Sequence, residues 1–466
     1  MELLAPAGNI ENFHAAIGAG ADAVYVGAPG FNARSLARDL RLEEIGAMIR
    51  LCHDRGKKLY VAANSILLEK DLPLVIETLA LLETLGPDAL IVQDLGLIHL
   101  VRRYFPRLKL HASTLMTAHN SQSVKFLAGL GCQRVVLARE LTIKEIAAIR
   151  SRSEVELEVF IHGAMCFSYS GLCLFSSFLG GKSGLRGRCV QPCRRAYGTS
   201  GKGGKGGKSG RGASGGAYLF SMNDLDGLAA VPALREIGIT SLKIEGRLRS
   251  AHYVRNVVAA YRMVLDTPQD RIEDVLPEAE AQVRQALSRR LTPGYFFSPQ
   301  PAEAITPYHS GNTGLHLGRV ESLQAAGEGL FCRLTLKEGL AVGDRLRIHI
   351  EPSGERLAFT LKELLVNRDP VQHAAAATVV RIALPPGCRP EKGGSLDLYK
   401  IDAGGTDRSE TEVLAVAAVK KELNGNRSRL ARRIQSITWE AWESGIRKDI
   451  QPQADRPSTI RDAAIK

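Results

Sequence analysis

The first 265 residues repeat one pattern, in which a short apolar run is followed by a stretch with helical periodicity. The apolar runs cover residues 1–7, 21–27, 57–64, 88–94, 108–114, 134–140, 155–163 and 241–247. Helical patterns lie between many of these runs, as in residues 10–20, 42–56, 72–86 and 142–151. Several helical patterns end at a glycine, which is a common helix stop. Continuous apolar strands that alternate with helices predict parallel pairing through βαβ crossovers.

The number of repeats predicts the fold. Eight strand candidates, the last followed by a helical stretch at 251–265, match a TIM-like (β/α)8 barrel in number and size. We therefore predict an α/β protein whose barrel spans residues 1–265. An open doubly wound sheet is the alternative, but no Gly-x-Gly-x-x-Gly motif follows the first strand to favour it.

The alternation of strand and helix patterns is interrupted after the seventh predicted strand, which covers residues 155–163. The gap before the next helical pattern holds a cysteine-rich stretch and then a Gly/Ser/Lys-rich stretch at 198–217. The second composition is typical of a flexible loop. We therefore predict an insertion at about 163–217. A loop after a strand lies at the C-terminal face of such a barrel, where these barrels carry out their chemistry.

The composition changes again beyond the barrel. Residues 266–310 are expected to form a helical linker. Short strand patterns separated by Gly, Asp and Pro turns predict a small β-barrel at 311–403. Its stretch 340–348 resembles a turn of translation-factor β-barrel modules, which often contact RNA. Residues 404–466 are expected to be a basic tail, with a helix beyond about residue 420 and a disordered end.

Half of the eight cysteines fall within one short stretch, at Cys166, Cys173, Cys189 and Cys193. The chain opens without a signal-peptide pattern, so we expect a cytoplasmic protein in which disulfides are a poor explanation. Only Cys189 and Cys193 have the close spacing of a zinc knuckle. The looser overall pattern favours an iron–sulfur cluster and leaves zinc or unligated thiols open. The other cysteines are expected to be buried apolar residues: Cys52, Cys132, Cys332 and Cys388.

Positive charge is concentrated in two segments. Residues 182–211 hold nine Lys or Arg and no Asp or Glu, and residues 420–466 hold 11 cations against six acids. The whole chain has a net charge of +12, so the remainder is close to neutral. This pattern favours a local anionic partner, above all nucleic acid, over a merely solubilising surface. No apolar run approaches the roughly 20 residues that span a bilayer, so no membrane contact is expected.

Polar side chains lie at or near the C-terminal ends of the predicted strands, where a barrel would bring them to its mouth. They are Asn64, Asp94, Ser113, Arg139, Glu140, His162, Lys243, Glu245 and Arg247. We expect catalytic roles for Glu140, His162, Glu245 and Arg247, and substrate contacts for the other five. The alternative is structural, with the strand charges paired to Arg139 and Glu140 and with His162 bonded to a backbone carbonyl. Arg139, Lys243 and Arg247 suit a small carboxylated donor, because arginine forks match carboxylates.

Residues 158–176 resemble the signature of the U32 peptidase-like proteins, also called collagenase-like proteases. The match runs through Glu158, Phe160, Gly163, Ala164, Met165, Cys166, Gly171, Cys173 and Ser176. Phe175 departs from the aliphatic residue expected there. The blocks LAPAGN, GADAVYVG, ARELT, RGRCVQPCRRAY and LKIEGR are also similar to the family's, in order. The resemblance covers about residues 1–265 closely and the predicted β-barrel more loosely.

The resemblance implies an activity different from the family's name. Relatives take part in oxygen-independent hydroxylation of RNA, at a tRNA wobble uridine or a 23S rRNA cytidine, and others hydroxylate a ubiquinone precursor. They carry a 4Fe–4S cluster on four cysteines, with prephenate implicated as the hydroxyl source in the RNA branch. The resemblance therefore implies that Cys166, Cys173, Cys189 and Cys193 are cluster ligands. The length resembles the tRNA-directed group, whereas residues 180–194 are closer to the rRNA-directed group.

The sequence thus predicts an iron–sulfur enzyme, or enzyme component, that hydroxylates RNA with a donor such as prephenate and that has an electron-transfer partner. A peptidase is one alternative. No Gly-x-Ser-x-Gly elbow follows a predicted strand and no His-Glu-x-x-His helix occurs. A cysteine protease would pair Cys166 with His162, and a cluster would remove that nucleophile. The other alternative is a non-catalytic RNA-binding partner with a structural cluster.

Overall fold

The computed structural model describes most of the chain. The described residues are 1–34, 40–198, 217–286, 289–301, 303–307, 314–326, 329–351, 355–385, 388, 394–402 and 414–446. Two predicted segments therefore lie largely or partly outside them. They are the Gly/Lys-rich loop, at 199–216, and the end of the basic tail, at 447–466.

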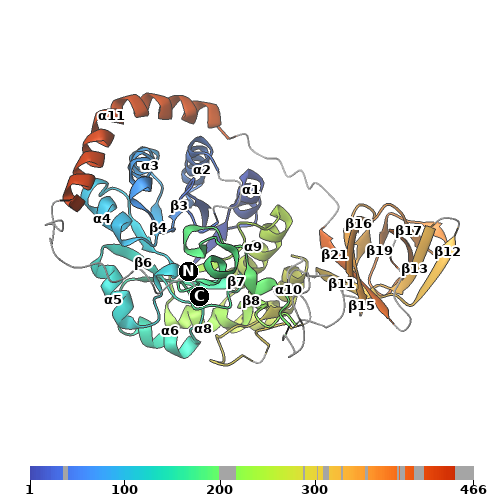
Figure 1. The fold of residues 1–466 in the computed structure, drawn as a ribbon. Helices are drawn as coiled ribbons and strands as arrows, with labels where there is room; N and C mark the ends of the chain where they lie inside the picture. Colours follow the sequence, from blue (N-terminus) through green and yellow to red (C-terminus); the bar gives the residue numbers. More distant parts are fainter. Residues whose placement is uncertain are drawn as a thin grey trace, which may run out of the picture.

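Eight parallel strands form a closed barrel in the first part of the chain (Figure 1). They are β1 (Glu2–Pro6), β2 (Ala23–Gly27), β3 (Lys58–Ala63), β4 (Ala89–Val92), β5 (Leu110–Ala112), β6 (Cys132–Val136), β7 (Glu156–Ala164) and β9 (Ser241–Ile244). Strand β9 pairs in parallel with both β7 and β1, which closes the ring. The predicted TIM-like α/β barrel is therefore confirmed, and each of its strands overlaps a predicted apolar run.

Helices surround this barrel. They are α1 (Ile10–Gly18), α2 (Leu42–Asp54), α3 (Leu72–Leu85), α4 (Leu95–Tyr104), α5 (Ser121–Gly129), α6 (Ile143–Arg150), α8 (Val231–Ile237) and α9 (Ala251–Asp266). Several begin at a polar residue whose side chain accepts a backbone N–H of the first helical turn, as Asn9, Asn120, Thr142 and Ser250 do. Such caps satisfy N–H groups that have no partner inside the helix.

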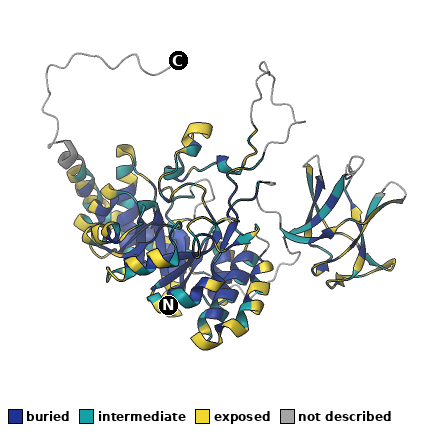
Figure 2. Ribbon diagram, turned by 90° about the horizontal axis from the view of Figure 1, so that it is seen from below, coloured by how far each residue is buried: buried dark blue, intermediate teal, exposed yellow. Residues whose placement is uncertain are grey.

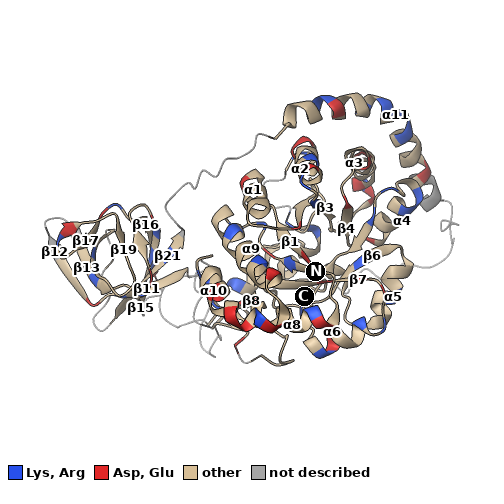
Figure 3. Ribbon diagram, turned by 180° about the vertical axis from the view of Figure 1, so that it is seen from behind, with Lys and Arg blue, Asp and Glu red and all other residues tan. Residues whose placement is uncertain are grey.

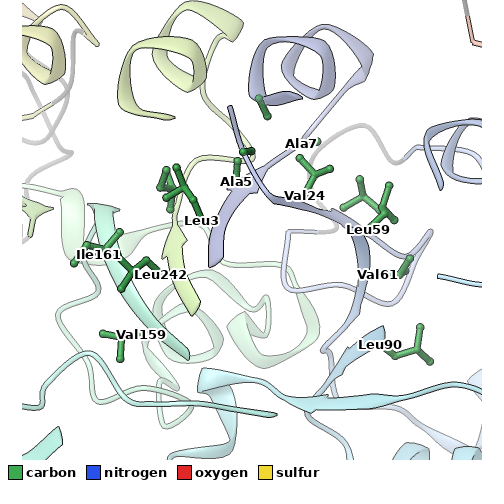
Figure 4. Packing of buried hydrophobic residues seen from close by; sticks show 14 of the residues in the cluster. Leu3, Ala5, Ala7, Val24, Leu59, Val61, Leu90, Val159, Ile161 and Leu242 are labelled. Carbon is green, nitrogen blue, oxygen red and sulfur yellow. The ribbon is translucent and has the colours of Figure 1, made fainter. Parts of the chain in front are cut away.

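The strands bury alternate side chains in two layers. Leu3, Val24 and Leu59 point outward and pack beneath the helices, as Figure 4 shows. Their neighbours Leu4 and Tyr25 belong to a separate cluster inside the barrel. This alternation follows from the two-residue period of a β-strand. Figure 2 shows the result, with buried strands at the centre and helices exposed on their outer sides.

Charged side chains also fill the barrel interior. Arg134 contacts Glu2 at 2.6 Å and Glu158 at 3.1 Å, and the Nζ atom of Lys243 lies 2.9 Å from the other Glu158 oxygen. Glu158 is fully buried, and an unpaired carboxylate there would cost several kcal/mol of stability. Two cationic partners offset that cost. Lys243 is thus paired, but with Glu158 rather than with the Glu140 of the structural alternative.

Short elements follow β7 before the barrel resumes. Residues 165–197 contain the helix α7 (Phe175–Gly180) and two 3-10 turns, η3 (Gly184–Arg186) and η4 (Pro192–Arg194). Strand β8 (Asp224–Asp226) then pairs antiparallel with the end of β7, and β10 (Leu291–Thr292) pairs with β8. Helix α10 (Ile272–Arg284) lies between β9 and β10 in sequence and packs on α9.

Antiparallel sheets make up the region from residue 314 to 402. Their strands are β11 (Leu315–Arg319), β12 (Ser322–Ala326), β13 (Gly329–Thr335), β14 (Leu340–Ala341), β15 (Arg345–Glu351), β16 (Glu355–Thr360), β17 (Leu364–Val366), β18 (Asp369–Pro370), β19 (His373–Ala374), β20 (Val379–Leu384) and β21 (Ser395–Asp402). They form a four-stranded, a five-stranded and a two-stranded sheet. A separate hydrophobic core, which includes Cys332 and Cys388, lies among them. The predicted all-β character is confirmed at this level.

Helix α11 (Val416–Ile446) returns to the barrel and packs on α2 and α3. Val419 and Leu423 bury themselves against Ala47 and Leu81. Ion pairs also connect α11 to the barrel helices. Glu422 and Glu440 pair with arginines of these helices, and Arg433 pairs with the buried Glu83. Figure 3 marks Lys and Arg positions in blue along α11. None of the described helices combines the length and the apolar character needed to cross a membrane.

Candidate functional site

A cavity of about 200 Å³ lies at the C-terminal ends of the barrel strands. One part of its wall comes from strand ends and the loops that follow them, including Tyr25, Asn64, Ser113 and Phe160. The other part comes from the segment that follows β7. All four clustered cysteines lie on this wall: Cys166, Cys173, Cys189 and Cys193. The fold therefore gathers, at one cavity, thiols that are up to 27 positions apart in the sequence.

The four thiols line the cavity as free cysteines. Among the described residues, no three His, Cys, Asp or Glu side chains are close enough to enclose a single metal ion. Tetrahedral coordination at Zn–S distances of about 2.3 Å would need the sulfur atoms within about 4 Å of one another. The thiols as placed are therefore arranged more widely than around one zinc ion.

The thiols influence one another electrostatically. Burial raises the pKa of Cys193 to about 11, and the other three thiols add to this effect while Arg194 opposes it. Burial also raises the pKa of Cys166. The Cys189 sulfur accepts hydrogen bonds from Ser176 Oγ at 3.5 Å and from the Gln191 N–H at 3.4 Å. Without added positive charge in the cavity, the two shifted thiols are therefore neutral at pH 7.

Specific contacts fix the cysteine segment to the barrel. The Glu140 carboxylate accepts the Ser170 N–H at 2.6 Å and also contacts His119 at 3.3 Å. Gly171 has a φ of +81°, and a Cβ atom there would lie 2.1 Å from the carbonyl oxygen of Leu115. Both contacts lie between Cys166 and Cys173. They set the path of the chain that carries these two thiols.

Arg194 anchors the other end of the cysteine segment. Its guanidinium donates to the carbonyl oxygen of Met165 at 2.9 Å and to Ser221 Oγ at 3.0 Å. Burial, reinforced by Arg289, lowers the pKa of Arg194 to about 10, which still leaves it charged at pH 7. It lies next to Cys193 in the chain and itself lines the cavity. Arg194 thus ties the fourth thiol to the end of β7 and adds positive charge beside it.

Three arginines share one carboxylate on the strand side of the cavity. Glu245 lies 3.0 Å from Arg34 Nη2 and 3.8 Å from Arg139 Nη2. Burial opposes its ionisation, but Arg34, Arg139 and Arg247 outweigh burial and lower its pKa to about 2. Arg247 also donates to Asn32 Oδ1 at 3.0 Å. Three positive charges around one negative charge leave the cavity wall with a local surplus of positive charge.

Most of the residues predicted for the site are brought together. Six of the nine line the cavity: Asn64, Ser113, Arg139, Lys243, Glu245 and Arg247. Asn64 donates to Ser113 Oγ at 3.2 Å and accepts the Ala33 N–H at 3.0 Å. Arg139 stacks 3.9 Å from the centre of the Phe160 ring. These contacts hold the polar wall in place.

The other three predicted residues lie elsewhere. Asp94 caps α4 by accepting the Leu97 N–H at 2.9 Å. Glu140 anchors the cysteine segment as described above. His162 is buried outside the barrel, where its Nδ1 atom lies 3.3 Å from the Tyr261 hydroxyl of α9. The placement of His162 gives it no approach to the cavity that Cys166 lines.

Three charged residues of the cavity were not predicted from the sequence: Arg34, Arg194 and Arg289. Arg34 follows β2 by seven positions, in a loop without periodicity, so no strand-end rule identified it. Arg194 was counted among the clustered cations but was given no role. Arg289 lies after α10, and its contact with the buried Asp224 at 2.9 Å depends on a distant part of the chain. A search for arginines in all loops after strands would have included Arg34 and Arg194 but not Arg289.

Fold and cavity together define a TIM-like barrel protein with a cysteine-lined pocket at the mouth of the barrel. The family described as Peptidase family U32 matches residues 8–306, which is more than half of the chain. The chain therefore belongs to this family, as its motifs led us to expect.

Curated relatives carry different names. The chain is 37% identical over 313 residues to the 23S rRNA 5-hydroxycytidine C2501 synthase of Escherichia coli, covering 67% of this chain and 44% of that protein. It is 37% identical over 265 residues to tRNA hydroxylation protein P1 of Bacillus subtilis, covering 57% of this chain and 63% of that protein. It is 36% identical over 303 residues to an uncharacterized protease of Methanocaldococcus jannaschii, covering 64% of this chain and 73% of that protein. The chain thus spans less than two thirds of the first two relatives.

Proposed function

We propose that this protein is an enzyme, or an enzyme component, for the oxygen-independent hydroxylation of a base in tRNA or rRNA. The observation that carries the proposal is the meeting of four free thiols and a group of arginines at one barrel-mouth cavity. Relatives named for hydroxylation of tRNA and of 23S rRNA support this reading. The identity of the RNA is part of the proposal, and both classes are candidates.

The residues fit a 4Fe–4S cluster held by the four clustered cysteines. A cluster contains several irons, so its ligands are spaced more widely than those around a single ion, and no three of the described thiols are close enough to hold one metal ion. Hydrogen-bond donors to the Cys189 sulfur are of the kind that tune such clusters. Arg139 and Arg194 offset the negative charge of thiolate ligands. When bound, the cluster would supply iron able to polarise a donor oxygen or to pass electrons.

The arginine wall suits a small donor that carries carboxylates, such as prephenate. Arg34, Arg139 and Arg247 surround Glu245, and the surplus of positive charge can be balanced by the carboxylates of a donor. Arg139 and Arg247 would orient the donor, because each is held by a second contact to the protein. Ala164 accepts from Arg139 at 2.7 Å and Asn32 accepts from Arg247 at 3.0 Å. A donor bound here would lie between the charged wall and the thiols.

A cysteine peptidase finds less support in this geometry. That mechanism needs a thiol activated by a nearby imidazole. His162, the histidine closest to Cys166 in sequence, bonds Tyr261 on the helix side of the barrel. The other alternative is a non-catalytic RNA-binding partner with a structural cluster. Only an assay of hydroxylation activity distinguishes this alternative from the enzyme.

The proposal is tested by deleting the gene and analysing nucleosides from tRNA and rRNA by mass spectrometry. We expect one hydroxylated pyrimidine to disappear and to return when the wild-type gene is supplied. Cys189→Ala should fail to restore it, because one of the four thiols is lost. Cys332→Ala, which removes a buried cysteine of the β region, is the matched control and should restore it.

Two results would contradict the proposal. Identical nucleoside profiles with and without the gene would remove RNA hydroxylation as the function. Full restoration by Cys189→Ala would remove the thiols from the reaction.

A further inference from the structure

A group of exposed apolar side chains lies within the cysteine segment. It consists of Phe167, Tyr169, Leu172, Leu174, Phe178 and Leu179, which we call the aromatic rim. Phe178 is 91% exposed and Tyr169 is 63% exposed. These six are a third of the large hydrophobic side chains exposed among the described residues, within 13 positions. Scattered exposed hydrophobics are ordinary, but a continuous group of them marks an interaction surface.

The aromatic rim is built on a fixed base. The Phe175 and Tyr197 rings are stacked with centroids 6.1 Å apart, and Phe167 meets Phe220 edge to face at 4.9 Å. Ser176 Oγ accepts the Val190 N–H at 3.1 Å beneath α7. The segment that carries the rim is therefore held in place before a partner binds, so its backbone does not have to be ordered on binding.

The aromatic rim adjoins the cavity. Tyr169 lines the cavity itself, and Leu172 and Leu174 flank Cys173, whose side chain lines it too. If one part of a molecule binds the rim, an adjacent part of the same molecule can therefore enter the cavity. The rim is a surface beside the candidate reaction site rather than a remote one.

The positive charge of the same segment indicates what kind of partner the rim would bind. Lys182, Arg188 and Arg195 are exposed and make no ion pair within the described part of the chain. The sequence from 162 to 197 contains no Asp or Glu. Rings and cations together, in a segment that itself carries no acid, match a polyanion with flat apolar faces. Single-stranded nucleic acid has that chemistry, because its bases expose faces that a duplex hides.

We propose that the aromatic rim binds unpaired RNA nucleotides by stacking, with Phe178 and Tyr169 as the stacking platforms and the three cations on the backbone. This inference rests on the proposed function for the choice of RNA, and it adds that the substrate segment is single-stranded. Stacking would hold nucleotides beside the target base, which then enters the cavity.

The test measures binding of full-length protein to a fluorescently labelled single-stranded oligoribonucleotide and to the duplex of the same sequence. Phe178→Ala should weaken binding to the single strand by about tenfold, as expected for the loss of one base stack, and should leave duplex binding unchanged. Phe178→Tyr should bind like the wild type, whereas Phe178→Leu should be as weak as Phe178→Ala. Phe126→Ala on α5, where the ring is 63% exposed away from the cavity, is the matched control and should have no effect.

A second readout concerns the cations. Arg188→Gln should flatten the dependence of log affinity on log salt by about 0.7 for the single strand, as expected for one lost phosphate contact. Phe178 has little contact to lose in the folded protein, so unfolding of its variants is not expected, and circular dichroism verifies this.

Three outcomes would overturn the inference. Phe178→Ala could bind the single strand like the wild type. Phe178→Leu could keep full affinity, which would mean that apolar area rather than a ring matters. Light scattering could also show that the wild type self-associates and that Phe178→Ala does not, which would make the rim a contact between protein copies. None of these depends on hydroxylation, so an inactive protein that still needs Phe178 to bind single strands would refute the proposed function alone.

Discussion

Replacing Glu245 by glutamine removes the carboxylate that Arg34, Arg139 and Arg247 share, while keeping its shape. The folded protein lowers the pKa of this carboxyl from 4.5 to about 2, although burial alone would raise it. The difference of about 2.5 units corresponds to about 3 kcal/mol of stability at pH 7, at 1.36 kcal/mol per unit. Glu245→Gln is therefore expected to lower the free energy of unfolding by up to about 3 kcal/mol.

The pH dependence identifies the source of this loss. Because the folded pKa lies below the unfolded one, the contribution of Glu245 is complete above about pH 4.5 and is lost as the pH falls toward 2. At pH 3 the same two pKa values give Glu245 a remaining contribution of about 1.4 kcal/mol to the free energy of unfolding. The gap between wild type and variant should therefore narrow by roughly half between pH 7 and pH 3.

Urea unfolding followed by circular dichroism measures this gap at both pH values. Glu303→Gln is the matched control, because Glu303 forms an exposed ion pair with Arg290 and should change stability by less than about 1 kcal/mol. The reasoning is refuted if Glu245→Gln unfolds at the wild-type urea concentration at pH 7. It is also refuted if the gap is the same at pH 3.

Two further substitutions test the packing. Gly171→Ala should lower the free energy of unfolding by at least about 2 kcal/mol, because the new Cβ would meet the Leu115 carbonyl, and should expose the cysteine segment to proteolysis. Gly56→Ala is the control. Gly56 has a φ of +64° and open space around it, so this substitution should lower the free energy of unfolding by about 1 kcal/mol. An equal cost for both would contradict the contact. Leu423→Ala should lower the free energy of unfolding in urea by about 2–5 kcal/mol by opening a cavity beneath α11, and the exposed Leu74→Ala by less than about 0.5. An unchanged Leu423→Ala would mean that α11 is not docked.

The barrel could be predicted from the sequence because its strands are buried on both faces. Continuous apolar runs such as residues 23–26 and 89–92 leave few alternatives to a parallel sheet. Strand ends in a closed barrel converge, so Arg139 and Glu245 could be expected at one mouth although they are 106 positions apart. The four cysteines followed from their grouping and from the family resemblance.

His162 shows where the strand period fails. Along β7, Glu158 and Phe160 face the barrel interior, and an unbroken two-residue period would send His162 there too. The register with β9 shifts between Phe160 and His162, which turns the imidazole toward α9. A bulge of this kind depends on the partner strand, so the strand's own residues do not reveal it.

Long-range contacts explain the other differences. Glu140 was expected to be catalytic, but its carboxylate is bound to the Ser170 N–H, 30 positions away. Helix α11 covers Ala47 of α2 and Leu81 of α3, and no local sequence pattern indicates that a distant helix packs on these residues. Arg34 reaches Glu245 from a loop, and loop paths are set by contacts rather than by periodicity.

Metal analysis of anaerobically purified protein tests the central claim most directly. The account predicts about four iron and about four acid-labile sulfide per chain, their loss in Cys166→Ala, and their retention in Cys388→Ala. One zinc per chain without iron, or the same iron content in Cys166→Ala as in the wild type, would contradict it.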